Sequence, residues 1–180
     1  MSAILGSLRR LIKLFEENSI PYMVTGGYAL PFYGRVRATV DVDLAVSITG
    51  DKGFDHLLAS LREASFEPTI CSPRNPLIIV VDRKKGTETE IWLRPDGIFF
   101  DDETLRRRRK AELGRDLSAW IVSAEDFIVS KLARPDRGAV DEQDVKSVLV
   151  RQGAELDTEY LQKRAKQAGV LAVLQAIQAS

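Results

Sequence analysis

Cysteine and histidine are nearly absent from this 180-residue chain, and their scarcity removes whole classes of chemistry. The single cysteine, Cys71, excludes an intramolecular disulfide and a zinc site built from several thiolates. The single histidine, His56, excludes metal motifs that pair two histidines on one helix. His56 falls within Phe54–Leu61, a predicted amphipathic helix, where an ordinary surface or boundary position is the simpler interpretation. Any catalysis by this chain is therefore expected to use carboxylates.

An excess of one charge is also missing, as are long apolar runs. Lys and Arg total 26, and so do Asp and Glu, so the overall charge predicts no particular attraction to nucleic acid or membrane. No apolar run approaches the roughly 20 residues that span a bilayer, and no secretory leader pattern is evident. We therefore expect a cytoplasmic protein with no membrane partner. The 44% of apolar and 29% of charged residues are typical of a folded domain.

Periodic apolar residues predict an α/β domain, of α+β character, built on a small mixed sheet. Apolar side chains recur at helical spacing over residues 4–15 and again over residues 52–64. Between these helices, Tyr22–Thr25 is a short apolar run of strand character, and two glycines separate it from a short helix predicted over Tyr28–Tyr33. Further strands are expected at residues 40–46, 66–71, 77–82 and 88–93.

The pattern changes beyond Pro95, and we expect two parts: a core over residues 1–95 and a C-terminal part over residues 96–180 that packs on it. In the second part, Ala119–Val122 is expected to add a strand. Ser123 resembles a helix cap, although an aspartate replaces the usual Glu or Gln three residues later. The remaining helices, which make this part a helical subdomain, are expected at residues 139–152, 157–168 and 170–178.

Two aspartates, Asp41 and Asp43, alternate with apolar residues in the predicted strand at residues 40–46. Side chains two residues apart on a strand share one face, with Cα atoms roughly 7 Å apart. Two carboxylates drawn to 4 Å repel by about 4 kcal/mol at an effective dielectric near 20, unless a cation lies between them. Oxygen ligands suit Mg²⁺ or Mn²⁺, and a pair of such ions can activate a hydroxyl and neutralise leaving phosphates. The alternative is a solvent-facing edge strand, where acids discourage aggregation.

A pair of glycines, Gly26 and Gly27, lies between a predicted strand and a predicted helix. Backbone N–H groups at such a turn can approach a bound anion, and the helix N-terminus favours negative charge. Taken alone, two glycines are equally well explained as a tight turn. Because they precede the strand with Asp41 and Asp43, the two features together describe a site for a nucleoside triphosphate.

The segments Val24–Leu30 and Arg37–Leu44 resemble the signature of the DNA polymerase beta-type nucleotidyltransferase superfamily. The Arg-x-Thr-x-Asp-x-Asp form is similar to the abortive-infection, AbiEii-type toxin branch and its minimal relatives. The resemblance implies a nucleotidyltransferase core and a two-metal transfer of a nucleotidyl group from a nucleoside triphosphate to a hydroxyl of RNA, protein or a small molecule. It also implies that Thr25, Gly26 and Gly27 bind the nucleotide.

The superfamily pattern needs a third carboxylate on a later strand, and Glu90 fits this place. Glu88 points to the same side of that strand and is a rival. The family more commonly has Asp here, and Glu is longer by one methylene. By this resemblance Asp41, Asp43 and Glu90 form the catalytic, metal-binding set. An exposed strand residue is the alternative for Glu90.

Similarity continues through Ser123–Leu132 and Asp141–Val145, which resemble the helical segment of the same branch. By this likeness Lys131 meets the triphosphate, while an ordinary solvated lysine is the alternative. Arg37, on the approach to the strand with the aspartates, is a candidate phosphate contact. Asp141 and Asp144 are expected to serve as a helix cap and a first-turn charge.

Five consecutive cations, Arg106–Lys110, are open to two interpretations. They could steer RNA or a triphosphate toward a site. A solvated helix face or hinge explains most of them as well, because no aromatic residues are interleaved for base stacking, with one or two arginines near the site. Trp92 and Trp120 are expected to be core residues.

Three functions remain open on sequence alone. The leading hypothesis is a metal-dependent nucleotidyltransferase, with the toxin of a toxin–antitoxin pair acting on tRNA or protein as one form of it. A non-catalytic nucleotide-binding module on the same fold is the second. The third is a partner-binding protein that uses no nucleotide.

Overall fold

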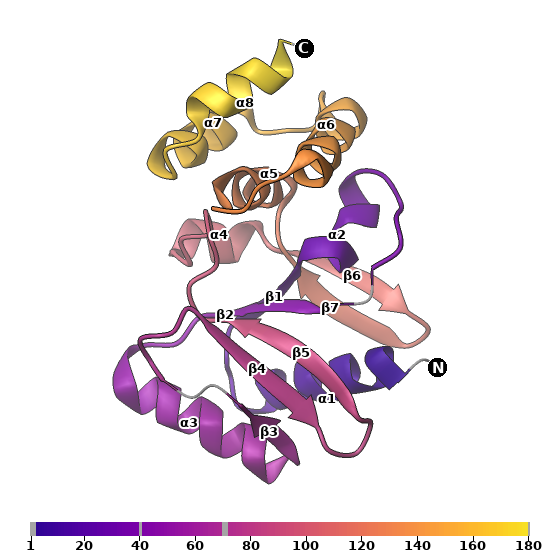
Figure 1. Cartoon of the computed structure of the whole chain (residues 1–180), viewed down its shortest axis with the longest axis vertical. Coiled ribbons are helices and arrows are strands. Elements are labelled where there is room, and N and C mark those ends of the chain that lie inside the picture. The colour runs from indigo at the N-terminus through magenta and orange to yellow at the C-terminus, as the bar shows by residue number, and fades with distance from the viewer. Residues whose placement is uncertain (1–2, 40, 70–71, 180) are drawn as a thin grey trace.

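Seven strands form a single mixed sheet, which Figure 1 shows with the C-terminal helices gathered beyond one end of its strands. The computed structural model describes residues 3–39, 41–69 and 72–179. From edge to edge the strands are β3 (Phe66–Pro68), β4 (Leu77–Asp82), β5 (Thr87–Trp92), β2 (Asp43–Val46), β1 (Tyr22–Thr25), β7 (Leu117–Ile121) and β6 (Arg109–Gly114). The expected α/β fold with a mixed sheet is confirmed.

Eight helices accompany the sheet in the described part of the chain. They are α1 (Ala3–Glu17), α2 (Gly26–Tyr33), α3 (Gly50–Glu63), α4 (Asp102–Arg107), α5 (Ala124–Ala133), α6 (Ala139–Gln152), α7 (Thr158–Gln167) and α8 (Leu171–Gln178). α1 buries the apolar stripe that its sequence spacing predicts, including Leu8, Leu11 and Phe15. Within the described residues, no helix combines the length and apolar character that a membrane span requires.

The centre of the sheet brings three polar residues into one row. β1 pairs antiparallel with β2, and β2 pairs parallel with β5. This register sets Thr25 opposite Asp43, and Asp43 opposite Glu90. Neighbouring strands lie about 4.8 Å apart, so these residues are close neighbours at one end of the sheet. The rest of β1 and β2 is buried apolar surface, which holds the row in place.

Most of the predicted elements are present, and two differences in where they begin affect the residues of interest. The strand expected at residues 40–46 begins at Asp43, so Asp41 precedes it, and Val40 lies outside the described residues, as does Cys71. The helix expected from Tyr28 begins at Gly26, so both glycines belong to its first turn. The backbone N–H groups expected to bind phosphate therefore belong to the first turn of a helix, and not to a separate turn before it.

Two elements, α4 and β6, were not predicted and occupy the stretch around the basic run. α4 begins after Asp101, whose side chain accepts a hydrogen bond from the backbone N–H of Thr104 at 2.8 Å. β6 is an edge strand with mostly exposed side chains, so it lacks the alternation by which a half-buried strand is recognised.

The C-terminal half contributes both to the sheet and to the helical group. β7 lies beside β1, with Val24 opposite Ile121, and the sheet therefore crosses residue 95. The division into parts 1–95 and 96–180 stays a prediction. The expected cap at Ser123 is confirmed, because its Oγ accepts a hydrogen bond from the backbone N–H of Asp126 at 3.1 Å. A hydrophobic core cluster joins residues from both halves.

Candidate active site

A cavity of about 600 Å³ lies where the ends of β1, β2 and β5 meet helix α5. It gathers all the residues that the sequence predicts for nucleotide or metal binding. They are Thr25, Gly26, Gly27, Arg37, Asp41, Asp43, Glu90 and Lys131. Segments far apart in the chain supply them, so the fold brings together what the sequence only suggests.

The first glycine, Gly26, is required by a close approach between backbone and carboxylate. Its φ of +60° is in the left-handed region, and a Cβ there would lie 1.8 Å from Oδ2 of Asp43. A Cβ on Gly27 would lie 2.4 Å from Oγ1 of Thr39. Thr25, at the N-cap of α2, makes no side-chain capping bond. The N-terminus of α2 thus begins directly beside the carboxylate, with room for backbone but not for a side chain.

The carboxylate wall consists of Asp43 and Glu90, with Asp41 beside them. Burial raises the pKa of Asp43 above its ordinary range. Burial and the neighbouring charge of Asp43 also raise the pKa of Glu90, and the charge of Asp41 adds to this. Glu90 therefore interacts electrostatically with both aspartates, and the charges of Lys131 and Arg134 offset part of the rise in the pKa of Asp43.

A divalent cation fits the donor chemistry of this wall, although its three acids do not form a closed ligand set. Over residues 3–39, 41–69 and 72–179, no group of three or more His, Cys, Asp or Glu side chains is arranged to hold a metal ion. The fit rests on the oxygen donors of these side chains and on their raised pKa values. Repulsion raises the pKa of Glu90, and burial raises the pKa of Asp43. A bound Mg²⁺ or Mn²⁺ would offset both effects. Asp43 and Glu90 are the adjacent pair, and Asp41 is exposed.

Trp92 lies beside this wall, where sequence reasoning expected a core residue. It is partly buried, lines the cavity, and donates a hydrogen bond from Nε1 to Oε2 of Glu90 at 3.2 Å. That bond opposes the rise in the pKa of Glu90 because it stabilises the charged form. The rival Glu88 is exposed and does not line the cavity. The structure therefore brings Glu90, and not Glu88, to the aspartates.

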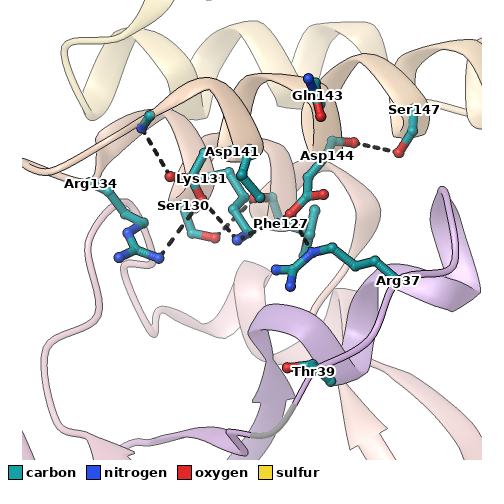
Figure 2. A network of polar contacts seen from close by, with 12 residues as sticks. Arg37, Thr39, Phe127, Ser130, Lys131, Arg134, Asp141, Gln143, Asp144 and Ser147 are labelled. Atoms are coloured by element: carbon teal, nitrogen blue, oxygen red, sulfur yellow. Dashed lines mark hydrogen bonds and ion pairs between the residues drawn. The ribbon is translucent and has the colours of Figure 1, made fainter.

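Lys131 is not a solvated lysine, because its side chain is buried in a network of ion pairs (Figure 2). Only 5% of the residue is exposed. Its Nζ lies 2.9 Å from Oδ1 of Asp141 and 3.4 Å from Oδ2 of Asp144. Arg37 reaches the same network, with Nε 3.3 Å from Oδ2 of Asp144. Both predicted phosphate contacts are thus held by carboxylates of helix α6.

The two aspartates of α6 do different things. Asp141 caps the helix as expected, because its Oδ2 accepts a hydrogen bond from the backbone N–H of Gly138 at 3.2 Å. Burial opposes ionisation there, but the hydrogen bonds from Lys131 and Gly138 hold the pKa of Asp141 below its ordinary range. Asp144 is fully buried and pairs with three cations, so the expectation of a simple first-turn charge is wrong.

Two cavity-lining arginines, Arg94 and Arg134, were missed from the sequence. Spacing alone could have suggested them, since Arg94 continues the alternation of Glu90 and Trp92 and Arg134 lies three residues after Lys131. Further lining residues are Thr39, Pro76, Pro95, Asp96, Ile98, Ser130, Pro135 and Asp136.

The basic run Arg106–Lys110 contributes nothing to the cavity lining, so the expectation of one or two arginines near the site is wrong. Arg107 pairs with Asp157 at 2.7 Å and lies over the ring of Tyr160. Arg108 donates to the backbone oxygen of Tyr22 at 2.7 Å. Arg107 thus joins α4 to α7, and Arg108 joins the end of α4 to β1.

Solved structures share this fold at low sequence identity. The antibiotic-resistance factor ANT(2'')-Ia aligns in its solution structure over 99% of this chain and 99% of its own, with TM-score 0.62 and 16% identity. Its crystal structure in complex with adenylyl-2''-tobramycin aligns over 92% and 97%, with TM-score 0.58 and 16% identity. The lincosamide antibiotic adenylyltransferase LnuA, bound to lincomycin, aligns over 79% and 94%, with TM-score 0.53 and 14% identity.

No protein-family model matches the chain, and no curated protein sequence is significantly similar to it. The structural likeness therefore shows the fold, which is that of known nucleotidyltransferases. What the chain does with this fold has to be argued from the cavity.

Proposed function

We propose that this chain is a nucleotidyltransferase that moves a nucleotidyl group from a nucleoside triphosphate to a hydroxyl of a small molecule. One observation carries the proposal: the N-terminus of α2, the carboxylate pair Asp43 and Glu90, and the cations Arg37 and Lys131 all line one cavity. The fold supports it, because LnuA and ANT(2'')-Ia share the same architecture. Their structures hold lincomycin and adenylyl-2''-tobramycin, which favours a small-molecule acceptor here as well.

In this proposal one group of cavity residues binds the phosphates and another holds the metal ion. Gly26 and Gly27 offer backbone N–H groups to the phosphates, beside Thr25, and Arg37 and Lys131 neutralise phosphate charge. Asp41, Asp43 and Glu90 are the residues that would hold Mg²⁺ or Mn²⁺. When bound, the ion would supply charge neutralisation of the phosphates and activation of the acceptor hydroxyl.

The bond changes follow from this division. The acceptor oxygen attacks the α-phosphorus, a new P–O bond forms, and the bond to the β-phosphate oxygen breaks, so that pyrophosphate leaves. The proton of the hydroxyl passes to a carboxylate of the wall. Glu90 is the candidate acceptor, because it lines the cavity beside Asp43.

The test is transfer of label from each of four α-labelled nucleoside triphosphates, with Mg²⁺ present and absent. Acceptors are a panel of hydroxyl-bearing small molecules, total RNA and total protein. We expect label on a small molecule, in the presence of Mg²⁺, and none with Asp43→Asn. Label on tRNA or protein alone would overturn the small-molecule acceptor and support the toxin form of the proposal, in which an antitoxin partner in the cytoplasm restrains the enzyme.

A non-catalytic nucleotide-binding module on the same fold is the second candidate. It is favoured by the absence, in the described residues, of a closed three-carboxylate metal set. Its mark is a melting temperature raised by nucleoside triphosphate, through binding to the folded state, without label transfer to any acceptor.

A further inference from the structure

The second buried aspartate of α6, Asp144, lies outside the cavity lining yet contacts two cations inside it. It is 0% exposed. Its Oδ1 is 2.8 Å from Nε of Arg35, and its Oδ2 is 3.3 Å from Nε of Arg37 and 3.4 Å from Nζ of Lys131. Figure 2 shows the contact to Arg37, with Lys131 alongside. One carboxylate thus serves three cations, two of which line the cavity.

These three cations come from two separate parts of the chain. Lys131 belongs to α5, whereas Arg35 and Arg37 belong to the segment of residues 34–42 between α2 and β2. Long cationic side chains lose considerable rotamer freedom when they are fixed, and three of them close together also repel one another. A buried carboxylate shared by all three offsets both costs, because the attraction in each ion pair compensates the lost rotamer freedom and neutralises part of the positive charge.

The same helix also holds the backbone at Gly34 and Arg35. The backbone N–H of Arg35 donates to Oγ of Ser147 at 3.0 Å, and Arg151 donates to the backbone oxygen of Gly34 at 2.8 Å. A Cβ on Gly34 would lie 2.4 Å from Oγ of Ser147, so segment and helix are in close contact. α6 therefore fixes the backbone just before Arg37, which lines the cavity.

We propose that Asp144 is a positioning residue that holds Lys131 and Arg37 at the triphosphate end of the cavity. The inference rests on the proposed function in that it takes this end to be where the phosphates bind. Asp144 does not touch the phosphates. It orients the two cations that do, and Lys131 keeps donor capacity for a phosphate oxygen because its ammonium group has three N–H bonds.

The sign of one substitution separates positioning from simple electrostatics. Asp144→Asn removes a negative charge near the site of an anion, and charge alone would then strengthen anion binding. Loss of positioning has the opposite effect, because Lys131 and Arg37 are no longer held toward the phosphates. A weakened affinity is therefore expected only if orientation dominates.

The experiment titrates the full chain with inorganic tripolyphosphate, with and without Mg²⁺, and measures affinity by calorimetry. We expect Asp144→Asn to weaken binding at least tenfold. Asp82→Asn is the matched control: Asp82 is equally buried and pairs with Arg10, but lies outside the cavity lining. This control is expected to lower the melting temperature and leave tripolyphosphate affinity within twofold of the unmodified chain. Binding by Asp144→Asn that is as tight as, or tighter than, that of the unmodified chain overturns the proposal.

A second pair of variants decides the matter if Asp144→Asn does not fold. Arg35 and Arg37 both pair with Asp144, but only Arg37 lines the cavity. We expect Arg37→Gln to weaken tripolyphosphate binding at least tenfold and Arg35→Gln less than threefold. Equal losses would mean that these ion pairs merely dock the segment 34–42, which overturns positioning.

Kinetics give an independent readout where transfer is observed. Asp144→Asn is expected to raise KM for the nucleoside triphosphate while kcat at saturation changes less than KM, because the carboxylate wall is intact. A fall in kcat with an unchanged KM contradicts the proposal. Absence of transfer in the unmodified chain would count against the proposed function, whereas the tripolyphosphate titration tests positioning without any transfer.

Discussion

The cavity has a sheet wall, with Asp43 and Glu90, and a helix wall, with Lys131. The two walls differ in how their charges are compensated. On the sheet, Asp43 and Glu90 lie in adjacent strands, and the pKa of each is raised by burial and, for Glu90, also by the neighbouring acid. On the helices, Lys131 is enclosed by Asp141 and Asp144, and the pKa of Asp141 is lowered by the hydrogen bonds it accepts. The sheet wall gathers acids, whereas the helix wall has its cations already paired and in place. Such a cavity suits a ligand that brings both a metal ion and an anion.

The largest expected effect comes from removing charge on the sheet wall. We expect Asp43→Asn to lower the rate of nucleotidyl transfer at least about a hundredfold, because charge neutralisation by a bound metal ion accounts for several kcal/mol of transition-state stabilisation. The free energy of unfolding should stay the same or increase, since burial disfavours the charged form of this side chain. Label transfer and a thermal melt measure the two quantities. A variant that keeps more than a tenth of the activity would break the contrast between the walls.

A backbone substitution beside the sheet wall should lower both stability and the response to metal. An alanine in the left-handed region costs about 1–2 kcal/mol, and at Gly26 its Cβ would also collide with Asp43. We expect Gly26→Ala to lower the free energy of unfolding by more than that and to reduce the Mg²⁺-dependent rise in melting temperature with nucleotide.

The matched control for this substitution is Gly50→Ala. Gly50 has a φ of +62°, and a Cβ added there would meet nothing within 4 Å, so the strain is the same and the collision is absent. Denaturant unfolding of both variants isolates the collision. Equal losses of stability would show that Asp43 moves aside freely and does not need the glycine.

The buried acid Asp126 lies outside the cavity lining. It tests whether a charge outside the cavity affects stability without affecting ligand binding. Burial raises its pKa to about 6, although Tyr160 and Ser123 donate hydrogen bonds to it. Because the folded-state pKa is the higher one, its contribution to stability is fully present below about pH 4 and is lost as the pH rises through 6. From pH 7 to pH 5 the unmodified chain should gain about 1 kcal/mol from this group.

The measurement is urea unfolding at the two pH values, on the unmodified chain and on Asp126→Asn. The variant should lose this part of the pH dependence and keep its affinity for tripolyphosphate. A variant whose stability changes with pH as steeply as that of the unmodified chain would assign the effect to other groups, such as Asp43 and Glu90.

The smallest expected effect concerns the hydrogen bond from Trp92 to Glu90. Trp92→Phe removes the N–H donor that stabilises the charged carboxylate, so the pKa of Glu90 should rise further. The acidic limb of the pH–activity profile should move to higher pH, with a loss of about threefold in rate on that limb. Trp120→Phe is the control, because Trp120 contacts Arg108 and Lys110 and does not line the cavity. An unchanged profile for Trp92→Phe would show that the bond does not matter.

Local sequence signals were sufficient for the fold class and for the glycine and aspartate pairs at the cavity, whereas Thr25, Glu90 and Lys131 came from the family resemblance. The spacing of Leu8, Leu11 and Phe15 predicts a buried helix face, and the alternation around Asp43 predicts a strand. Such signals work because amphipathic periods are set by the geometry of a single element. They fail for β6, whose side chains are mostly exposed.

Relations between distant elements could not be read from the sequence. The register of β2 against β5 decides that Glu90, and not Glu88, faces Asp43, and pairing across tens of residues has no local signature. The burial of Asp144 depends on cations from two other segments, so nothing in its local sequence distinguishes it from an ordinary helix acid. The sequence thus indicates which residues line the cavity. It says less about which buried residues hold them in position.

The placement of β7 beside β1 has a consequence for how the chain acquires its shape during synthesis. The strand that leads into the glycine pair is flanked on one side by β2, but its other flank is supplied by Leu117–Ile121, which emerges from the ribosome long afterwards. Until then β1 is an open edge, with unpaired backbone groups of the kind that attract other strands. A nascent chain stalled near residue 95 would present that edge to its neighbours, and only translation past residue 121 closes it.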